Sequence, residues 1–238
     1  ILKWLKDEGY DIGSEELPFN SSLLMSKLIN TRTNDIESQN NRPLDFLSIN
    51  EYMKLWDDLS DLPKNLIVKR WGEPTIAEDI EHEGFAINGL NFGKICLLIQ
   101  PQRGYDIDSD KDIHSPDLPP PHRYLAQYYW IEKVFKANVI SHIGKHGTVE
   151  WLPGKSIGLS NNCFPNIICP PIPHIYPFIV NDPGEGAQAK RRTKNTCTDS
   201  SYDDEKTNGI ESPAKCPASN PMGRIKAIKF DALSRFPK

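Results

Sequence analysis

The segment "KICLLIQ" (94–100) decides which fold class the sequence predicts. Its five central residues are all apolar and do not alternate with polar ones, as is typical of a strand buried on both faces. Such strands belong to sheets that helices cover on both sides, whereas a sheet with one wet face shows alternation. We therefore expect a helix-covered sheet around residues 95–99.

The segments that follow predict how this strand continues into a sheet. Residues 119–137, "PPPHRYLAQYYWIEKVFKA", begin with prolines and carry apolar residues near helical spacing. Two further strand candidates come after them, "NVISHI" (138–143) and "IYPFIV" (175–180). A strand, a long helix and a strand in this order predict parallel pairing with a right-handed crossover. The predicted fold class is α/β, with a parallel or mixed sheet, flanking helices and a place in a larger multidomain subunit.

Three regions of the chain differ in composition. Residues 1–75 are predicted to be mainly helical, with amphipathic segments at 1–10 and at 50–62, the latter after the candidate N-cap Asn50. Between these helices, "NTRTNDIESQNNRP" (30–43) is polar, and we expect a surface loop of low order. Residues 76–193 form the predicted α/β core. Residues 194–238, rich in Ser, Asp, Asn and Pro, are predicted to be a disordered tail without chemistry.

Charge and composition exclude several classes of protein. The net charge of −4 arises from 28 basic and 32 acidic residues and predicts no affinity for nucleic acid or anionic membranes. No apolar run approaches the roughly 20 residues that a membrane span needs. The five cysteines, with no C-x-x-C pair, argue against a disulfide framework or a thiolate zinc site. We expect reduced thiols in the cytoplasm, or in a plastid if the source is a eukaryote, and residues that precede Ile1.

Polar segments follow each of the three predicted strands of the core. They are "QPQRGYD" (100–106), "GKHGTVE" (144–150) and "NDPGEG" (181–186), at the carboxyl ends where α/β sheets bind ligands. Around the second, His142, His146 and Glu150 stand four residues apart. Neutral imidazole and carboxylate groups ligate metals and act as general bases. Taken alone, the same residues are also compatible with a structural or solvated role.

Three familiar motifs do not fit this segment. The zinc-protease helix needs Glu directly after its first His, and Ile143 occupies that position. "PGKS" (153–156) resembles the end of a phosphate-binding loop, but Val149 replaces the required glycine. Ser156 and Ser160 lie outside any G-x-S-x-G nucleophile elbow. The remaining prediction is a loop with metal-binding or general-base chemistry.

Neighbouring segments add positive charge to this loop. In "NDPGEGAQAKRR" (181–192), Pro183 and two glycines open a predicted helix whose free N–H groups can hold an anion. Basic residues follow at Lys190, Arg191 and Arg192; alternatively, they complement the helix C-terminus. Gln100 and Arg103 offer an amide and a carboxylate-binding fork, although Arg103 alone also fits a surface salt bridge. Together the loops predict a polar cavity for a substrate that carries carboxylates and takes up a metal.

Long blocks of the sequence also resemble a known family. They are "QPQRGYDID" (100–108), "PPHRYLAQYYW" (120–130), "SHIGKHGTVEWLPGKSIGLS" (141–160) and "PHIYPFIVNDPGEGAQAKRRT" (173–193). These blocks closely resemble the CobN-type large subunits of cobaltochelatase and, more distantly, the H subunits of magnesium chelatase. The resemblance runs from residue 1 to 193 and is strongest from Phe92. The magnesium branch typically has "NNPSEA" where this chain has "NDPGEG", so the cobalt branch is the better match.

The resemblance implies a function that the loops alone leave open. In the family this subunit binds the tetrapyrrole and the metal, while separate AAA+ subunits hydrolyse Mg-ATP; the absence of a P-loop here is consistent with that division. The implied reaction inserts Co²⁺, a substrate, into the corrin hydrogenobyrinic acid a,c-diamide in cobalamin biosynthesis, with Mg²⁺ and protoporphyrin IX as the alternative. The resemblance implies catalysis and metal binding by Glu150, first as proton acceptor, with His146 and His142. It implies substrate binding by Gln100, Arg103, Lys155, Glu185, Lys190, Arg191 and Arg192.

One departure from the family pattern affects the expected activity. Family members continue after "AKRRT" with an apolar folded segment, whereas "KNTCTDSS" (194–201) follows here. We therefore expect a fragment with an unrelated tail, which need not be active alone. Three hypotheses stay open: a piece of the chelatase ring-binding subunit, a tetrapyrrole-binding module without insertion activity, and a small metal-dependent hydrolase that uses His142 and His146.

Overall fold

The computed structural model describes most of the first 176 residues and several short segments beyond them. The described ranges are 1–13, 17–18, 20–82, 84–104, 115–143, 147–176, 188–189, 191–192, 195–197 and 227–230. Within them, the strands form one two-stranded and one six-stranded sheet. The predicted α/β class with a mixed sheet is confirmed.

The larger sheet has the strand order β3-β4-β8-β5-β6-β7. Its strands are β3 (Gly89–Phe92), β4 (Ile95–Ile99), β5 (Ile140–Ile143), β6 (His174–Tyr176), β7 (Asn195–Cys197) and β8 (Ala227–Phe230). The pair β3 and β4 is antiparallel, and every other pair is parallel. The predicted strands at 94–100, 138–143 and 175–180 are thus confirmed as β4, β5 and β6, except that residues 177–180 lie outside the described ranges.

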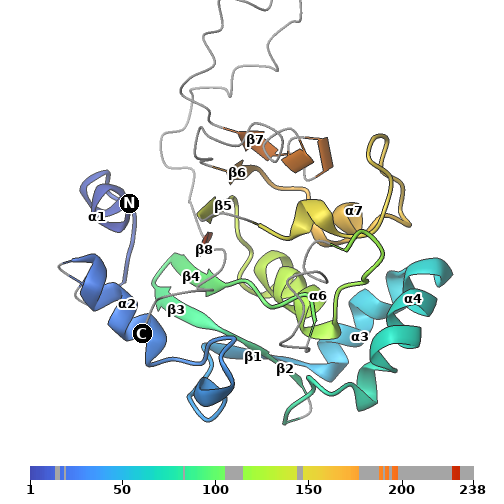
Figure 1. The fold of residues 1–238 in the computed structure, drawn as a ribbon. Helices are drawn as coiled ribbons and strands as arrows, with labels where there is room; N and C mark the ends of the chain where they lie inside the picture. Colours follow the sequence, from blue (N-terminus) through green and yellow to red (C-terminus); the bar gives the residue numbers. More distant parts are fainter. Residues whose placement is uncertain are drawn as a thin grey trace, which may run out of the picture.

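Strand β4 is buried on both faces, as its unbroken apolar sequence predicts. All five of its residues are buried. Cys96 and Leu98 belong to the main hydrophobic cluster, while Ile95 and Leu97 belong to a second cluster that includes residues of α1 (Leu2–Asp7) and α2 (Ser21–Ile29). Because successive side chains of a strand point to opposite faces, helices must cover both faces of β4. Figure 1 shows α1 and α2 on one side of the strands and the remaining helices on the other.

The tail differs from its prediction in two segments. Residues 195–197 and 227–230 form β7 and β8, although we expected disorder over 194–238. Strand β8 lies between β4 and β5, so these two are parallel but are not neighbours. A strand in that position obtains backbone hydrogen-bonding partners on both sides, and these partners are distant in the sequence, so the composition of the tail does not reveal them. The other residues of the tail lie outside the described ranges.

The remaining helices pack on the opposite side from α1 and α2. They are α3 (Ile49–Asp58), α4 (Asp61–Trp71), α6 (His122–Tyr129) and α7 (Phe164–Ile168); shorter turns are the 3-10 helices Ile36–Ser38, Pro74–Ile76 and Val149–Trp151 and the π-helical turn Trp130–Val134. Helix α6 contacts α3, α7 and β2. No helix in the described part of the chain is long and apolar enough to cross a membrane.

The first region is less separate from the core than its helical pattern suggests. Strand β1 (Asp45–Ser48) lies within residues 1–75 and pairs antiparallel with β2 (Gly84–Ile87). Helix α3 is capped by Ser48, whose Oγ accepts from the Glu51 N–H, and not by the expected Asn50. The predicted helix at 50–62 ends at Asp58, because the extended residues that follow interrupt it before α4 begins.

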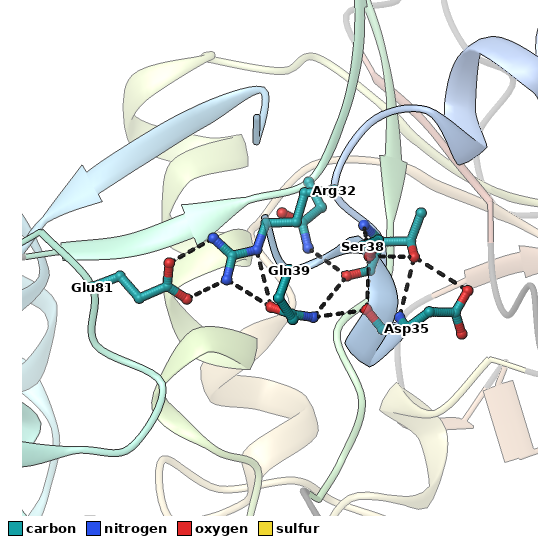
Figure 2. Close-up of polar contacts among 7 residues, drawn as sticks. Arg32, Asp35, Ser38, Gln39 and Glu81 are labelled. Carbon is teal, nitrogen blue, oxygen red and sulfur yellow. Dashed lines mark hydrogen bonds and ion pairs between the residues drawn. The ribbon is translucent and has the colours of Figure 1, made fainter. Parts of the chain in front are cut away.

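The polar segment 30–43 is ordered, contrary to the prediction of a low-order loop. The buried Arg32 guanidinium bonds both oxygens of the Glu81 carboxylate and also Gln39 Oε1 (Figure 2). The Ser38 hydroxyl lies 2.8 Å from the Thr33 hydroxyl and is likewise buried. A buried charge or hydroxyl needs hydrogen-bonding partners, and these contacts supply them. They hold the segment in one conformation although it has few apolar side chains.

Candidate functional site

Gln100 connects the carboxyl end of β4 with the loop after β5. Its Nε2 donates to the Tyr124 hydroxyl at 2.8 Å and to the Tyr128 hydroxyl at 3.0 Å. Its Oε1 accepts from the Thr148 hydroxyl at 3.0 Å, and Tyr124 in turn donates to Thr148 at 2.7 Å. Both ends of this buried amide are therefore bonded within the protein, and Gln100 holds the loop in place.

Arg103 is a buried residue that bonds backbone carbonyls. The residue is 1% exposed, and its Nη2 donates to the carbonyl oxygens of Ser115 and Leu118, both at 2.8 Å. Burial lowers the pKa of Arg103, whereas the negative charge of Glu150 raises it. The alternative of a surface salt bridge does not fit this burial.

Arg192 organises the loop that carries Glu150. The guanidinium donates to four carbonyl oxygens, those of Glu150 at 2.6 Å, Leu152 at 2.7 Å, Gly154 at 3.1 Å and Lys155 at 3.2 Å. Burial lowers the pKa of Arg192, and the Glu150 charge again opposes this effect. A guanidinium has five N–H donors in a fixed fork, so it can fix several turns of backbone at once.

Glu150 itself lies in the 3-10 helix Val149–Trp151 and is 3% exposed. Its negative charge opposes the lowering of the pKa values of Arg103 and Arg192 by burial, and all three residues are buried. By contrast, Lys155 and Arg191 are exposed. Among the described site residues, Gln100, Arg103 and Arg192 are buried and bonded to loops, whereas Lys155 and Arg191 are exposed cations.

His142 contacts a histidine that the sequence analysis did not select. The buried His142 Nε2 lies 3.2 Å from Nδ1 of the buried His174, and the two rings stack with centroids 5.4 Å apart. Tyr176 packs edge-on against His142, and its hydroxyl accepts from the Gly147 N–H at 2.8 Å. The alternation of His174 and Tyr176 along one face of β6 is the signal that could have identified them.

Two of the three predicted metal ligands, His142 and Glu150, lie within the described residues. His146, Glu185 and Lys190 lie outside the described residues. Among those that are described, no group of three or more His, Cys, Asp or Glu side chains is arranged as metal ligands. His142 and Glu150 therefore stand in two different surroundings, one of stacked imidazoles and one of arginines.

Comparisons with known proteins give a consistent family. The model of the family CobN/Magnesium Chelatase matches residues 1–200. Over 195 residues the chain is 42% identical to the aerobic cobaltochelatase subunit CobN of Pseudomonas aeruginosa, covering 82% of this chain and 16% of that protein. Over 193 residues it is 32% identical to the chloroplastic magnesium-chelatase subunit ChlH of Oryza sativa subsp. indica, covering 81% and 13%.

A solved structure is similar over the same extent. The catalytic subunit of cobaltochelatase from Mycobacterium tuberculosis matches with a TM-score of 0.69 and 36% identity, covering 82% of this chain and 17% of that one. The chain spans about a sixth of the length of these cobalt-type relatives.

Proposed function

Because the chain belongs to the CobN/magnesium chelatase family, we propose that it is part of the ring-binding subunit of an ATP-dependent cobaltochelatase. The proposed reaction inserts Co²⁺ into a corrin such as hydrogenobyrinic acid a,c-diamide. The observation that carries this choice of metal is the greater identity to the cobalt-type relative, 42% against 32% for the magnesium-type one. Mg²⁺ and protoporphyrin IX are the alternative substrates.

The chemistry of insertion assigns roles to the site residues. The ring must lose two N–H protons and the ion must lose water, so a general base and moderately strong metal ligands are needed. We assign the proton acceptor to Glu150 and metal binding to His142 and His146. Neutral imidazole holds a divalent cobalt ion without the permanence of a four-ligand structural site.

Ring carboxylates are assigned to the exposed cations. Lys155 and Arg191 are accessible, and Lys190 and Glu185 complete the proposed ring-binding set. Gln100, Arg103 and Arg192 are bonded to other protein groups, so we assign them to positioning these loops. ATP would be hydrolysed by AAA+ partner subunits, in the cytoplasm.

A second candidate is a tetrapyrrole-binding module without insertion activity. It needs only the exposed cations Lys155 and Arg191, which suit the carboxylates of a ring, and no metal ligand or base. The two candidates differ in turnover: both predict ring binding, and only the first predicts insertion when Co²⁺, Mg-ATP and the ATPase subunits are supplied.

The experiment is a titration of the purified chain with a metal-free corrin and, separately, with a porphyrin. Binding is followed by quenching of tryptophan fluorescence. We expect saturable binding with preference for the corrin, and weaker binding in Arg191→Ala. Preference for the porphyrin would reverse the choice of substrate, and binding of neither ring would reject the proposal. In a subunit that inserts cobalt, Glu150→Gln should slow insertion; an unchanged rate would rule out Glu150 as the base.

A further inference from the structure

The stacked pair His142 and His174 places two ring nitrogens 3.2 Å apart. We propose that these two imidazoles form a binding site for a divalent metal, with His174 as a ligand that complements His142. The identification of this metal with the Co²⁺ substrate rests on the proposed function. The site itself rests on the arrangement of the two rings.

The distance between the ring nitrogens supports a shared ion. Imidazole nitrogens bind zinc at about 2.0–2.1 Å, so two of them on one ion lie about 3.4 Å apart in a tetrahedral site and about 3.0 Å apart in an octahedral one. The distance between His142 Nε2 and His174 Nδ1 is 3.2 Å, between these values. The same distance also fits an N–H···N hydrogen bond, which is the competing explanation.

The backbone places both histidines on the same face of adjacent parallel strands. In the register of β5 and β6, Ile140 pairs with His174. Side chains two residues apart share a face, so His142 and Tyr176 lie on that face as well. Both histidines are buried, at 3% and 1% exposure. Packing already restricts the two rings, so little side-chain entropy is lost when they bind an ion.

Metal binding here requires no net proton transfer when both rings are neutral. With the proton of His142 on Nδ1 and that of His174 on Nε2, the two facing nitrogens each present a lone pair. If the pair instead shares a hydrogen bond, a change of tautomer frees the second lone pair before the ion binds. Two protein ligands leave the other coordination positions for water or ring nitrogens, as a site that passes its ion on requires.

Tyr176 connects this site to the loop that carries Glu150. Its ring packs edge-on against His142, and its hydroxyl accepts the Gly147 N–H. The position of the imidazole pair is thus tied to the loop after β5. A metal bound by the pair would therefore influence the loop that contains the proposed base.

The test measures metal binding by the full chain in the absence of any ring. Co²⁺ is titrated by calorimetry and by its visible absorption. We expect one site, weakened at least about tenfold in His174→Ala and in His142→Ala, since even the loss of a group behind a ligand costs 10–100-fold. The control is His82→Asn, because His82 has a φ of 47°, which Asn tolerates, and lies before β2 in the other sheet. The inference would be overturned if His174→Ala bound Co²⁺ with wild-type affinity. It would also be overturned if His146→Ala lost binding while both variants of the pair kept it.

A measurement on the unaltered chain guards against variants that do not fold. With ¹⁵N-labelled histidine and Zn²⁺, the nitrogen resonances of His142 Nε2 and His174 Nδ1 should shift on saturation. Unshifted resonances would reject the site. Metal binding by the pair without corrin binding would reject the proposed function and retain the site, whereas corrin binding with no metal at the pair would do the reverse.

Discussion

At the scale of single residues, His122 is held in one tautomer by its neighbours. Nε2 lies 3.0 Å from the Gly72 carbonyl, which can only accept, so Nε2 carries the proton. Nδ1 then accepts from the Tyr52 hydroxyl at 2.8 Å. Burial lowers the pKa of His122, against the opposing effects of the Gly72 hydrogen bond and the charges of Asp79 and Glu73. The folded protein therefore keeps this histidine neutral.

This lowered pKa predicts a loss of stability in mild acid. Below about pH 6.5 the imidazole of the unfolded chain binds a proton, whereas the imidazole of the folded protein does not. The free energy of unfolding therefore decreases as the pH decreases. The slope contributed by His122 is at most about 1.4 kcal/mol per pH unit, and it ends below the folded pKa. Urea unfolding between pH 7.5 and 5 should show this component in the wild type. His122→Gln should lack it, and equal slopes in both proteins would contradict the assignment.

The neighbouring residues Arg191 and Arg192 should respond differently to substitution. Arg192→Lys loses the fork that bonds four carbonyls, so we expect it to destabilise the protein by about 2–3 kcal/mol and to increase hydrogen exchange in residues 150–155. Arg191→Ala should weaken corrin binding without a change in unfolding, because its side chain is exposed. The reverse pattern, with corrin affinity lost only through Arg192→Lys in a fully stable protein, would make Arg192 the direct ligand.

At the scale of elements, the connection from the 3-10 helix Val149–Trp151 to α7 is formed without regular structure. Gly154 has a φ of 146°, and a Cβ there would lie 2.7 Å from the Cys163 Cβ. The Cys163 sulfur accepts from the N–H groups of Lys155 and Ser160, both at 3.4 Å. Desolvation raises the pKa of Cys163, but the hydrogen bonds from Ser160 and Lys155 together outweigh it, so the pKa is lowered. The connection depends on close backbone approach.

Two glycines of this connection provide a matched test. Gly158 has a φ of 65°, and a Cβ added there would meet no other atom. Gly158→Ala should therefore lower the free energy of unfolding by only about 1 kcal/mol, the strain of a left-handed backbone conformation. Gly154→Ala should cost about 1–3 kcal/mol more, because the new methyl group overlaps Cys163. Chemical unfolding of the two variants measures the difference. Equal losses of stability in the two variants would show that the backbone around Cys163 shifts to accommodate the methyl group.

At the scale of the whole molecule, polar contacts join the first region to the core and to the site. Arg32 bonds Glu81, the residue that bridges to the start of β2 (Figure 2). Asn34 Nδ2 donates to the Gln100 carbonyl at 2.7 Å, and Trp130 Nε1 donates to Asp45 at 2.7 Å. Residues 1–75 thus help to fix the end of β4, and the two regions of the sequence are not independent units.

The Arg32–Glu81 pair predicts a charge-specific loss of stability. Glu81→Gln keeps the shape of the side chain but leaves the Arg32 guanidinium, 7% exposed, without its counter-charge. We expect a loss of about 3 kcal/mol, at the low end of the range for broken buried pairs because Glu81 is 31% exposed. Glu37→Gln, an exposed carboxylate of the same segment, is the control and should unfold like the wild type. Equal stabilities of the two variants would show that the charge of Glu81 does not stabilise the fold.

Local patterns in the sequence were sufficient for the class of fold and for the family. The apolar run 95–99 predicted a strand covered on both faces, which is confirmed. The order of strand, helix and strand predicted parallel pairing; β4 and β5 are indeed parallel, but they do not pair because β8 lies between them. The conspicuous blocks between residues 100 and 193 were sufficient to identify the family, which the comparisons confirm. These features are readable because each depends on residues that are close together in the chain.

Contacts between distant parts of the chain decided what the sequence left open. The tertiary structure pairs His142 with His174, turns Arg103 and Arg192 toward backbone carbonyls, and orders the polar segment 30–43 around Arg32. An arginine that binds a substrate carboxylate and one that holds a loop have the same side chain and the same local sequence. Burial and the position of the partner distinguish them, and both arise only when segments far apart in sequence pack together.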